Sequence, residues 1–110
     1  MQWRPAPFHA GMTVTDEPGL YIEGLFGIRI ENTLLTTPYC STPFGEFLQF
    51  SSLTLCPIDT APIELSMLTL DELSWLNDYH RTVYNTLAPH LDSDHTEWLK
   101  DATKPLEVAK

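Results

Sequence analysis

The segment from Thr15 to Asn32, TDEPGLYIEGLFGIRIEN, decides the fold of the first half of the chain. Two turn signals, Pro18-Gly19 and Glu23-Gly24, divide it into short extended pieces. Residues 26–31 then alternate strictly between two kinds of side chain, which predicts a strand with one apolar and one charged face. The apolar face carries Phe26, Ile28 and Ile30, and the opposite face carries Gly27, Arg29 and Glu31.

Outward from this segment, residues 12–15 (MTVT) predict a strand before the first turn, and residues 47–58 predict another that Pro57 ends. The intervening residues 37–46 are rich in Pro, Ser and Thr, which favours a loop. The first half is therefore expected to hold antiparallel strands, and residues 59–67 to form a connector.

The last third has helical character. Thr69 and Glu72 have the spacing of a capping box, and apolar positions then recur every three or four residues up to Pro89. This predicts a helix from about 70 to 88, followed by a second from Asp92 or Ser93 to about Thr103. The fold class is therefore α+β. The repeating positions are Leu73, Leu76, His80, Val83 and Leu87.

Size and charge limit the possible functions. The chain has 110 residues, 43% of them hydrophobic, which suits one domain or part of one. A formal net charge of −9 argues against nucleic acid and anionic membrane surfaces as partners. The sequence shows neither an apolar run long enough to span a membrane nor a signal peptide, so we expect a cytoplasmic protein. Cys40 and Cys56 lack a CxxC spacing and are expected to be free thiols.

Glu17 and Glu31 are the candidate metal ligands, and each also has a simpler interpretation. Glutamate before Pro-Gly is often only a turn residue, and a strand face with Arg29 and Glu31 is often a solvated edge. Two carboxylates are also too few, because hard divalent cations prefer several oxygen ligands. The histidines do not complete a site: none pairs with another at HxH or HxxxH spacing, and structural or surface roles are preferred for His9, His80, His90 and His95.

The stretch GMTVTDEPGLYIEGLFGIRIENTLL resembles the C-terminal part of the catalytic domain of Xaa-Pro aminopeptidases (aminopeptidase P), which are metallopeptidases with the pita-bread fold. FLQFSSLTLCPID, LTLDELSWLNDYHRTVYNTLAPHL and EWLKDATKPL resemble the helical C-terminal extension of the longer members. The similarity runs from about residue 10 to 106. It implies a C-terminal fragment of a pita-bread fold, with residues 1–58 belonging to an incomplete catalytic domain and residues 59–110 to the helical extension.

The resemblance also implies residue roles. Glu17 matches a glutamate that ligates one of two divalent ions, usually Mn²⁺, and Glu31 matches the glutamate that bridges both. Tyr21 and Arg29 match positions that hydrogen-bond and orient the ligand carboxylates. The implied reaction is metal-dependent release of the N-terminal residue from peptides with proline at position two. Members of the family are often homodimers, which with the open strand edges predicts a homo-oligomer.

The departure from the family pattern is equally informative. The family uses five ligands, and its two aspartates and one histidine lie upstream of the EPG motif, where this chain has only 16 residues. We therefore expect the isolated chain to be inactive. The start, MQWRPAPFHAG, reads like the middle of a domain, so Met1 is expected to be an artificial start. The alternative is a freestanding non-catalytic peptide-binding or dimerisation module derived from the same fold.

The aromatic residues of the predicted helices could form an interface or pack internally, and both options stay open for Trp75, Tyr79 and Trp98.

Overall fold

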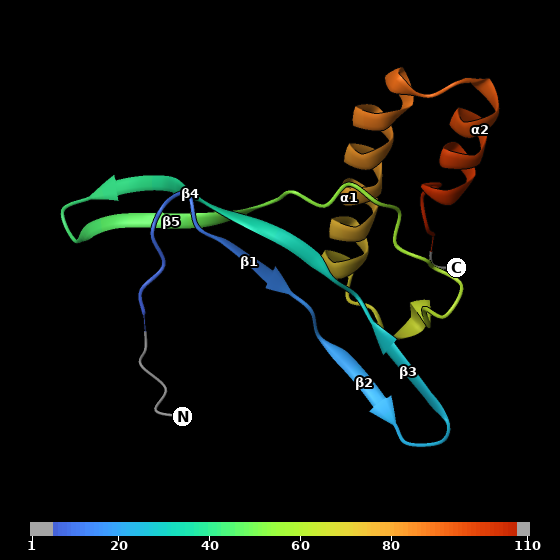
Figure 1. The fold of residues 1–110 in the computed structure, drawn as a ribbon, viewed down its shortest axis with the longest axis horizontal. Helices are drawn as coiled ribbons and strands as arrows, with labels where there is room; N and C mark the ends of the chain where they lie inside the picture. Colours follow the sequence, from blue (N-terminus) through green and yellow to red (C-terminus); the bar gives the residue numbers. More distant parts are fainter. Residues whose placement is uncertain (1–5, 108–110) are drawn as a thin grey trace. The chain divides into compact units, whose positions relative to one another are not determined.

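The computed structural model describes residues 6–107 and has the predicted α+β class. Antiparallel strands fill the first half and two α-helices the second (Figure 1). The chain divides into two compact units, residues 1–54 and residues 55–110. The beginning of the Pro-broken entry, residues 1–5, lies outside the described part.

The first unit consists of a three-stranded antiparallel sheet and a two-stranded hairpin. The sheet has the order β1-β4-β5, so that β1 and β5 are its edges. Strands β2 and β3 pair with each other, as Figure 1 shows. The strand bounds are β1 Thr13–Asp16, β2 Gly19–Ile22, β3 Phe26–Arg29, β4 Asn32–Thr42 and β5 Gly45–Ser52.

The predicted loop at residues 37–46 is wrong, because β4 continues to Thr42 and turns into β5 at Gly45. The pairing of β4 with β5 continues through residues that usually interrupt a strand. Pro38 faces Leu48, and the register shifts by one residue between Pro38 and Cys40. A proline is tolerated where its missing N–H would point away from the partner strand, and such positions occur at edges and bulges. Strand β1 pairs with β4 only over residues 32–35, so the side of β4 opposite β5 is an unpaired edge at Pro38.

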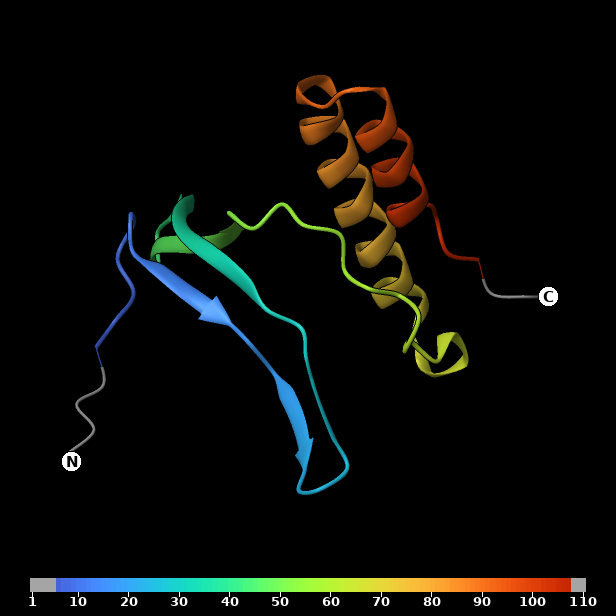
Figure 2. The same ribbon diagram turned by 45° about the vertical axis from the view of Figure 1, so that its right-hand side comes forward.

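The second unit is built from two antiparallel helices, which lie side by side in both views (Figure 2). Helix α1 (Leu70–Leu87) begins with the predicted capping box of Thr69 and Glu72, and α2 (Ser93–Ala102) begins at Asp92, whose side chain accepts the His95 N–H. Two 3₁₀ turns, η1 (Leu65–Met67) and η2 (Ala88–His90), flank α1. The core cluster joins Tyr79, Val83 and Leu99 across the helix pair.

Three side chains of α1 form hydrogen bonds with backbone groups of the extended segments that precede α1 and follow α2. The Tyr79 hydroxyl donates to the Cys56 carbonyl at 2.8 Å and accepts the Cys56 N–H at 3.4 Å. His80 Nε2 accepts the Ile58 N–H at 3.0 Å. The Asn77 amide both donates to the Leu106 carbonyl and accepts the Leu106 N–H, at 3.0 and 2.8 Å. His80 is fully buried, as expected for a structural histidine.

Within the described residues, neither helix is long and apolar enough to cross a membrane. Both cysteines are free, as predicted, and the structure places both of them on the surface.

Candidate metal centre

Glu17 and Glu31 occupy facing positions between two strand pairs. Asp16 pairs with Asn32 at the end of the β1–β4 ladder, and Gly19 pairs with Arg29 at the start of the β2–β3 ladder. The register is the same on both sides of the gap, so the intervening positions align Glu17 with Glu31. The Ile30 N–H donates to the Pro18 carbonyl at 3.3 Å inside this gap. Because facing carboxylates repel each other, the pair requires a cation between or beside its members.

In the structure this cation is the Arg29 guanidinium. A single nitrogen, Nη1, lies 2.9 Å from Glu17 Oε2 and 3.6 Å from Glu31 Oε2. These three side chains share a face because Glu31 lies two residues after Arg29 and Glu17 faces Glu31 across the gap. The pKa of Arg29 is raised, chiefly by its hydrogen bond to Tyr21 and by charge interactions with Tyr21 and Glu17. Arg29 therefore remains a permanent positive charge beside the two carboxylates.

Tyr21 lies on the same face and fixes the opposite side of the guanidinium. Arg29 Nε donates to the Tyr21 hydroxyl oxygen at 2.7 Å, and the guanidinium carbon lies 5.7 Å from the ring centre. Thr15, which the sequence motifs do not single out, donates a hydrogen bond from its hydroxyl group to Glu17 Oε1 at 2.9 Å. The signal that could have found it is its position, two residues before Glu17 in extended backbone and hence on the same face.

The donor set is chemically suited to a hard cation but small. Carboxylate oxygens are the ligands that Mg²⁺, Ca²⁺ and Mn²⁺ prefer, and such ions bind more than two of them. Residues 6–107 contain no group of three or more His, Cys, Asp or Glu side chains arranged to hold a metal ion. The predicted pair is thus brought together with Tyr21 and Arg29, and the described chain adds no third ligand. The side chains of Glu17 and Glu31 are 45% and 43% exposed, which leaves both accessible to a further layer of protein.

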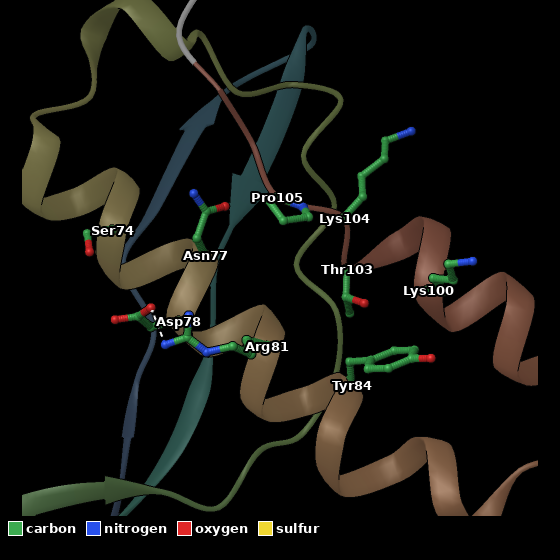
Figure 3. Close-up of a pocket in the computed structure, with 9 residues that line it drawn as sticks. All are labelled: Ser74, Asn77, Asp78, Arg81, Tyr84, Lys100, Thr103, Lys104 and Pro105. Carbon is green, nitrogen blue, oxygen red and sulfur yellow. Dashed lines mark hydrogen bonds and ion pairs between the residues drawn. The ribbon is translucent and has the colours of Figure 1, made fainter.

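The helical unit contains a separate pocket of about 610 Å³ between α1 and the segment that follows α2 (Figure 3). Tyr84 extends from α1 toward α2, and Arg81 is paired with Asp78 at 2.7 Å on its own helix. The Asn77 amide, also on this wall, is occupied by the Leu106 backbone. The basic side chains that line this pocket, Arg81, Lys100 and Lys104, are exposed, and each is paired with an acidic side chain on its own segment. The pocket therefore lacks the convergent unpaired polar groups of a built ligand site.

Comparison with known proteins gives two family matches. Residues 46–106 match the model described as the C-terminal region of peptidase M24, and residues 2–38 match the model of metallopeptidase family M24. Aminopeptidase P1 of Lotus japonicus is 46% identical over 109 residues, which are 96% of this chain and 17% of that protein. Xaa-Pro aminopeptidase 1 of Dictyostelium discoideum is 41% identical over 108 residues, 93% of this chain and 17% of the relative. These matches confirm the resemblance inferred from the sequence.

A solved structure agrees with the sequence matches. The X-prolyl aminopeptidase of Caenorhabditis elegans, described as a cytosolic enzyme with a dinuclear active site, superposes with a TM-score of 0.80 at 39% identity. The match covers 90% of this chain and 17% of that one. The strands and helices therefore form a fragment of a pita-bread fold. The chain spans about one sixth of the length of the relatives it matches.

Proposed function

The chain belongs to the family of the C-terminal region of peptidase M24, and on this premise we propose that it is the C-terminal part of a metal-dependent Xaa-Pro aminopeptidase. The substrate class is peptides with proline at position two, from which the complete enzyme releases the N-terminal residue. The observation that carries the proposal is the facing pair Glu17–Glu31, held by one arginine, in a chain that matches one sixth of such enzymes.

Glu17 and Glu31 are proposed as two ligands of the metal centre, with Mn²⁺ as the metal. The fit is that of a partial site: both donors are carboxylates, they face each other, and a third donor has to come from outside residues 6–107. When bound, a divalent ion supplies Lewis acidity and lowers the pKa of water, which provides the nucleophile for peptide hydrolysis. Arg29 and Tyr21 are proposed to keep the carboxylates ionised and oriented.

The remaining assignments are also proposals. We assign residues 1–58 to the incomplete catalytic domain and residues 59–110 to the helical extension, and we place the complete enzyme in the cytosol. The open edges of β1 and β5 support a homo-oligomer, because unpaired strand edges recruit further strands. Light scattering of the chain over a range of concentrations tests this: a monomer at every concentration contradicts it.

The direct test is a chimaera in which this chain replaces the matching C-terminal region of the C. elegans enzyme. Cleavage of an Xaa-Pro peptide and metal content by atomic absorption are measured for the chimaera and three variants. Glu17→Gln and Glu31→Gln should each lower activity and metal content by at least about tenfold, since each removes a ligand charge. Glu23→Gln, in the exposed turn between β2 and β3, is the matched control and should leave both unchanged.

The alternative, a freestanding non-catalytic module, makes a different prediction. It requires the native polypeptide to be about the size of this chain, 12.5 kDa. An antibody against residues 70–88 detects the native polypeptide in its source cells, and a band several times heavier supports the enzyme. A band at 12.5 kDa, together with a chimaera that has no activity, would refute the proposed function.

A further inference from the structure

Two glycines of the β2–β3 hairpin are explained by space and not by backbone conformation. Positive φ values occur at Gly11, Gly24 and Gly45, where turns require them, and are absent at Gly19 and Gly27. Both of these lie within paired strands, where glycine is disfavoured because it adds flexibility to the unfolded chain and has no side chain to pack. Another cause must therefore account for a missing side chain at these two positions.

The cause is the ring of Tyr21. Gly27 is the cross-strand partner of Tyr21, and Gly19 precedes it by two residues on the same face. A Cβ atom at Gly19 would lie 2.6 Å from the Tyr21 hydroxyl oxygen, and a Cβ atom at Gly27 would lie 2.7 Å from Tyr21 Cδ1. The ring thus lies flat across both glycines, in a slot that any side chain would close. We call these two positions the glycine slot.

The glycine slot determines the position of the Tyr21 hydroxyl group. Its oxygen accepts the Arg29 Nε–H at 2.7 Å, while Nη1 of the same guanidinium contacts Glu17 and Glu31. Every residue of β2 and β3 is exposed, so the described structure offers no packed layer that would otherwise orient the ring. The chain of contacts therefore runs from the glycines to the ring, from the ring to the guanidinium, and from there to the carboxylates.

We propose that Gly19 and Gly27 are positioning residues of the candidate metal centre, acting through Tyr21 and Arg29 on the carboxylates of Glu17 and Glu31. This inference rests on the proposed function for its catalytic consequence, but not for its structural one. The clashing atoms belong to a side chain that can swing away, so alanine at either position should displace Tyr21 and leave the hairpin paired. Alanine adopts extended backbone without strain and reduces the flexibility of the unfolded chain.

The first test uses the chain itself, without metal, by NMR. In Gly27→Ala, the contacts between the Tyr21 ring and residue 27 should disappear, and exchange of the Arg29 Nε–H should accelerate by at least about fivefold. Cross-strand contacts between Ile22 and Phe26 report that the hairpin is intact in every variant. Ile28→Ala is the matched control, because it truncates a neighbouring residue on the opposite face and should leave Arg29 unchanged. Unchanged ring contacts and exchange in Gly27→Ala would overturn the proposal.

The second test uses the chimaera and measures coupling. Gly27→Ala should lower kcat by about tenfold or more with KM within about twofold, and should lower the metal content. In a Tyr21→Ala background the same glycine substitution should have no further effect, because the ring it displaces is gone. Additive losses would mean that Gly27 acts on the hairpin itself and would refute the proposal. An inactive unsubstituted chimaera would count against the proposed function alone, and the NMR result would still decide the inference.

Discussion

Acidification should destabilise the helical unit through His80. This side chain is fully buried, and its Nε2 accepts the Ile58 N–H at 3.0 Å, so the neutral ring carries its proton on Nδ1. Within residues 6–107, Nδ1 has no hydrogen-bond partner. Protonation would place a charge in the interior and would force Nε2 to become a donor facing another donor. The Ile58 hydrogen bond and the imidazolium ion are therefore incompatible.

The magnitude follows from proton linkage. Burial lowers the pKa of His80, so between this lowered pKa and the ordinary value near 6.5 the unfolded chain binds more protons than the folded unit. Stability from this residue is complete above about pH 6.5 and decreases as the pH falls through the window. The slope can reach about 1.4 kcal/mol per pH unit for one group. The pKa values of the acidic groups Glu64, Glu72 and Asp92 are lowered by hydrogen bonds, so these groups remain ionised in the folded unit above pH 5.

Urea denaturation between pH 5 and 8 measures this slope, with the helical circular dichroism signal of α1 and α2 as the readout for the helical unit. His80→Gln keeps an acceptor for the Ile58 N–H and removes the titration, so its free energy of unfolding should vary much less with pH. His90→Gln alters an exposed histidine and should retain the wild-type slope. Equal pH dependence in wild type and His80→Gln would refute the argument from burial.

Two further substitutions test the local energetics of the same unit by thermal or urea unfolding. Thr69→Ala removes the capping box and should cost about 1 kcal/mol, whereas Thr69→Ser should retain most of the stability; equal loss in both would show that the hydroxyl does not cap. Leu99→Ala should cost about 2–5 kcal/mol because the residue is 1% exposed in the core, and Leu91→Ala, at a 40% exposed position, should cost much less. Similar losses at the two leucines would contradict the assigned core.

Local signals made the helical unit predictable. Thr69 and Glu72 mark the start of α1, and the three- and four-residue spacing found the buried positions Leu76, His80 and Val83. The sequence alone leaves both a core and an interface role open for Tyr79, because a helical aromatic residue suits either. In the structure Tyr79 is buried in the core, and its hydroxyl group donates a hydrogen bond to the backbone carbonyl of Cys56, 23 residues away. Contacts of this kind join distant backbone groups and leave no periodic pattern in the sequence.

Alternation of apolar and polar residues predicted strands in the first half of the chain. The prediction failed at residues 37–46, whose composition is typical of a loop although most of them belong to β4 and β5. The alternation at residues 26–31 predicts the shared face of Arg29 and Glu31 that their contact confirms, although β3 itself ends at Arg29. The predicted strand at residues 12–15 lies within one residue of β1, whereas the strand predicted over residues 47–58 already ends at Ser52. The strand through Pro38 was missed because Pro, Ser and Thr indicate loops, whereas the partner strand and the bulge decide the outcome here. The facing of Glu17 and Glu31 follows from the hairpin register, which is fixed once the turn at Glu23-Gly24 is placed.

Stability and the candidate chemistry are separated in this chain. The buried hydrophobic side chains belong to the helices, as Leu76, Tyr79, Val83 and Leu99 show, whereas the hairpin next to the carboxylates contains only exposed residues. Exposed ion pairs contribute little to stability, so Arg29 alone holds Glu17 and Glu31 loosely. Two loosely held carboxylates do not build a dinuclear centre. A Mn²⁺ titration of the isolated chain should therefore show weak binding and no peptidase activity, and tight binding of two ions per chain would refute this view.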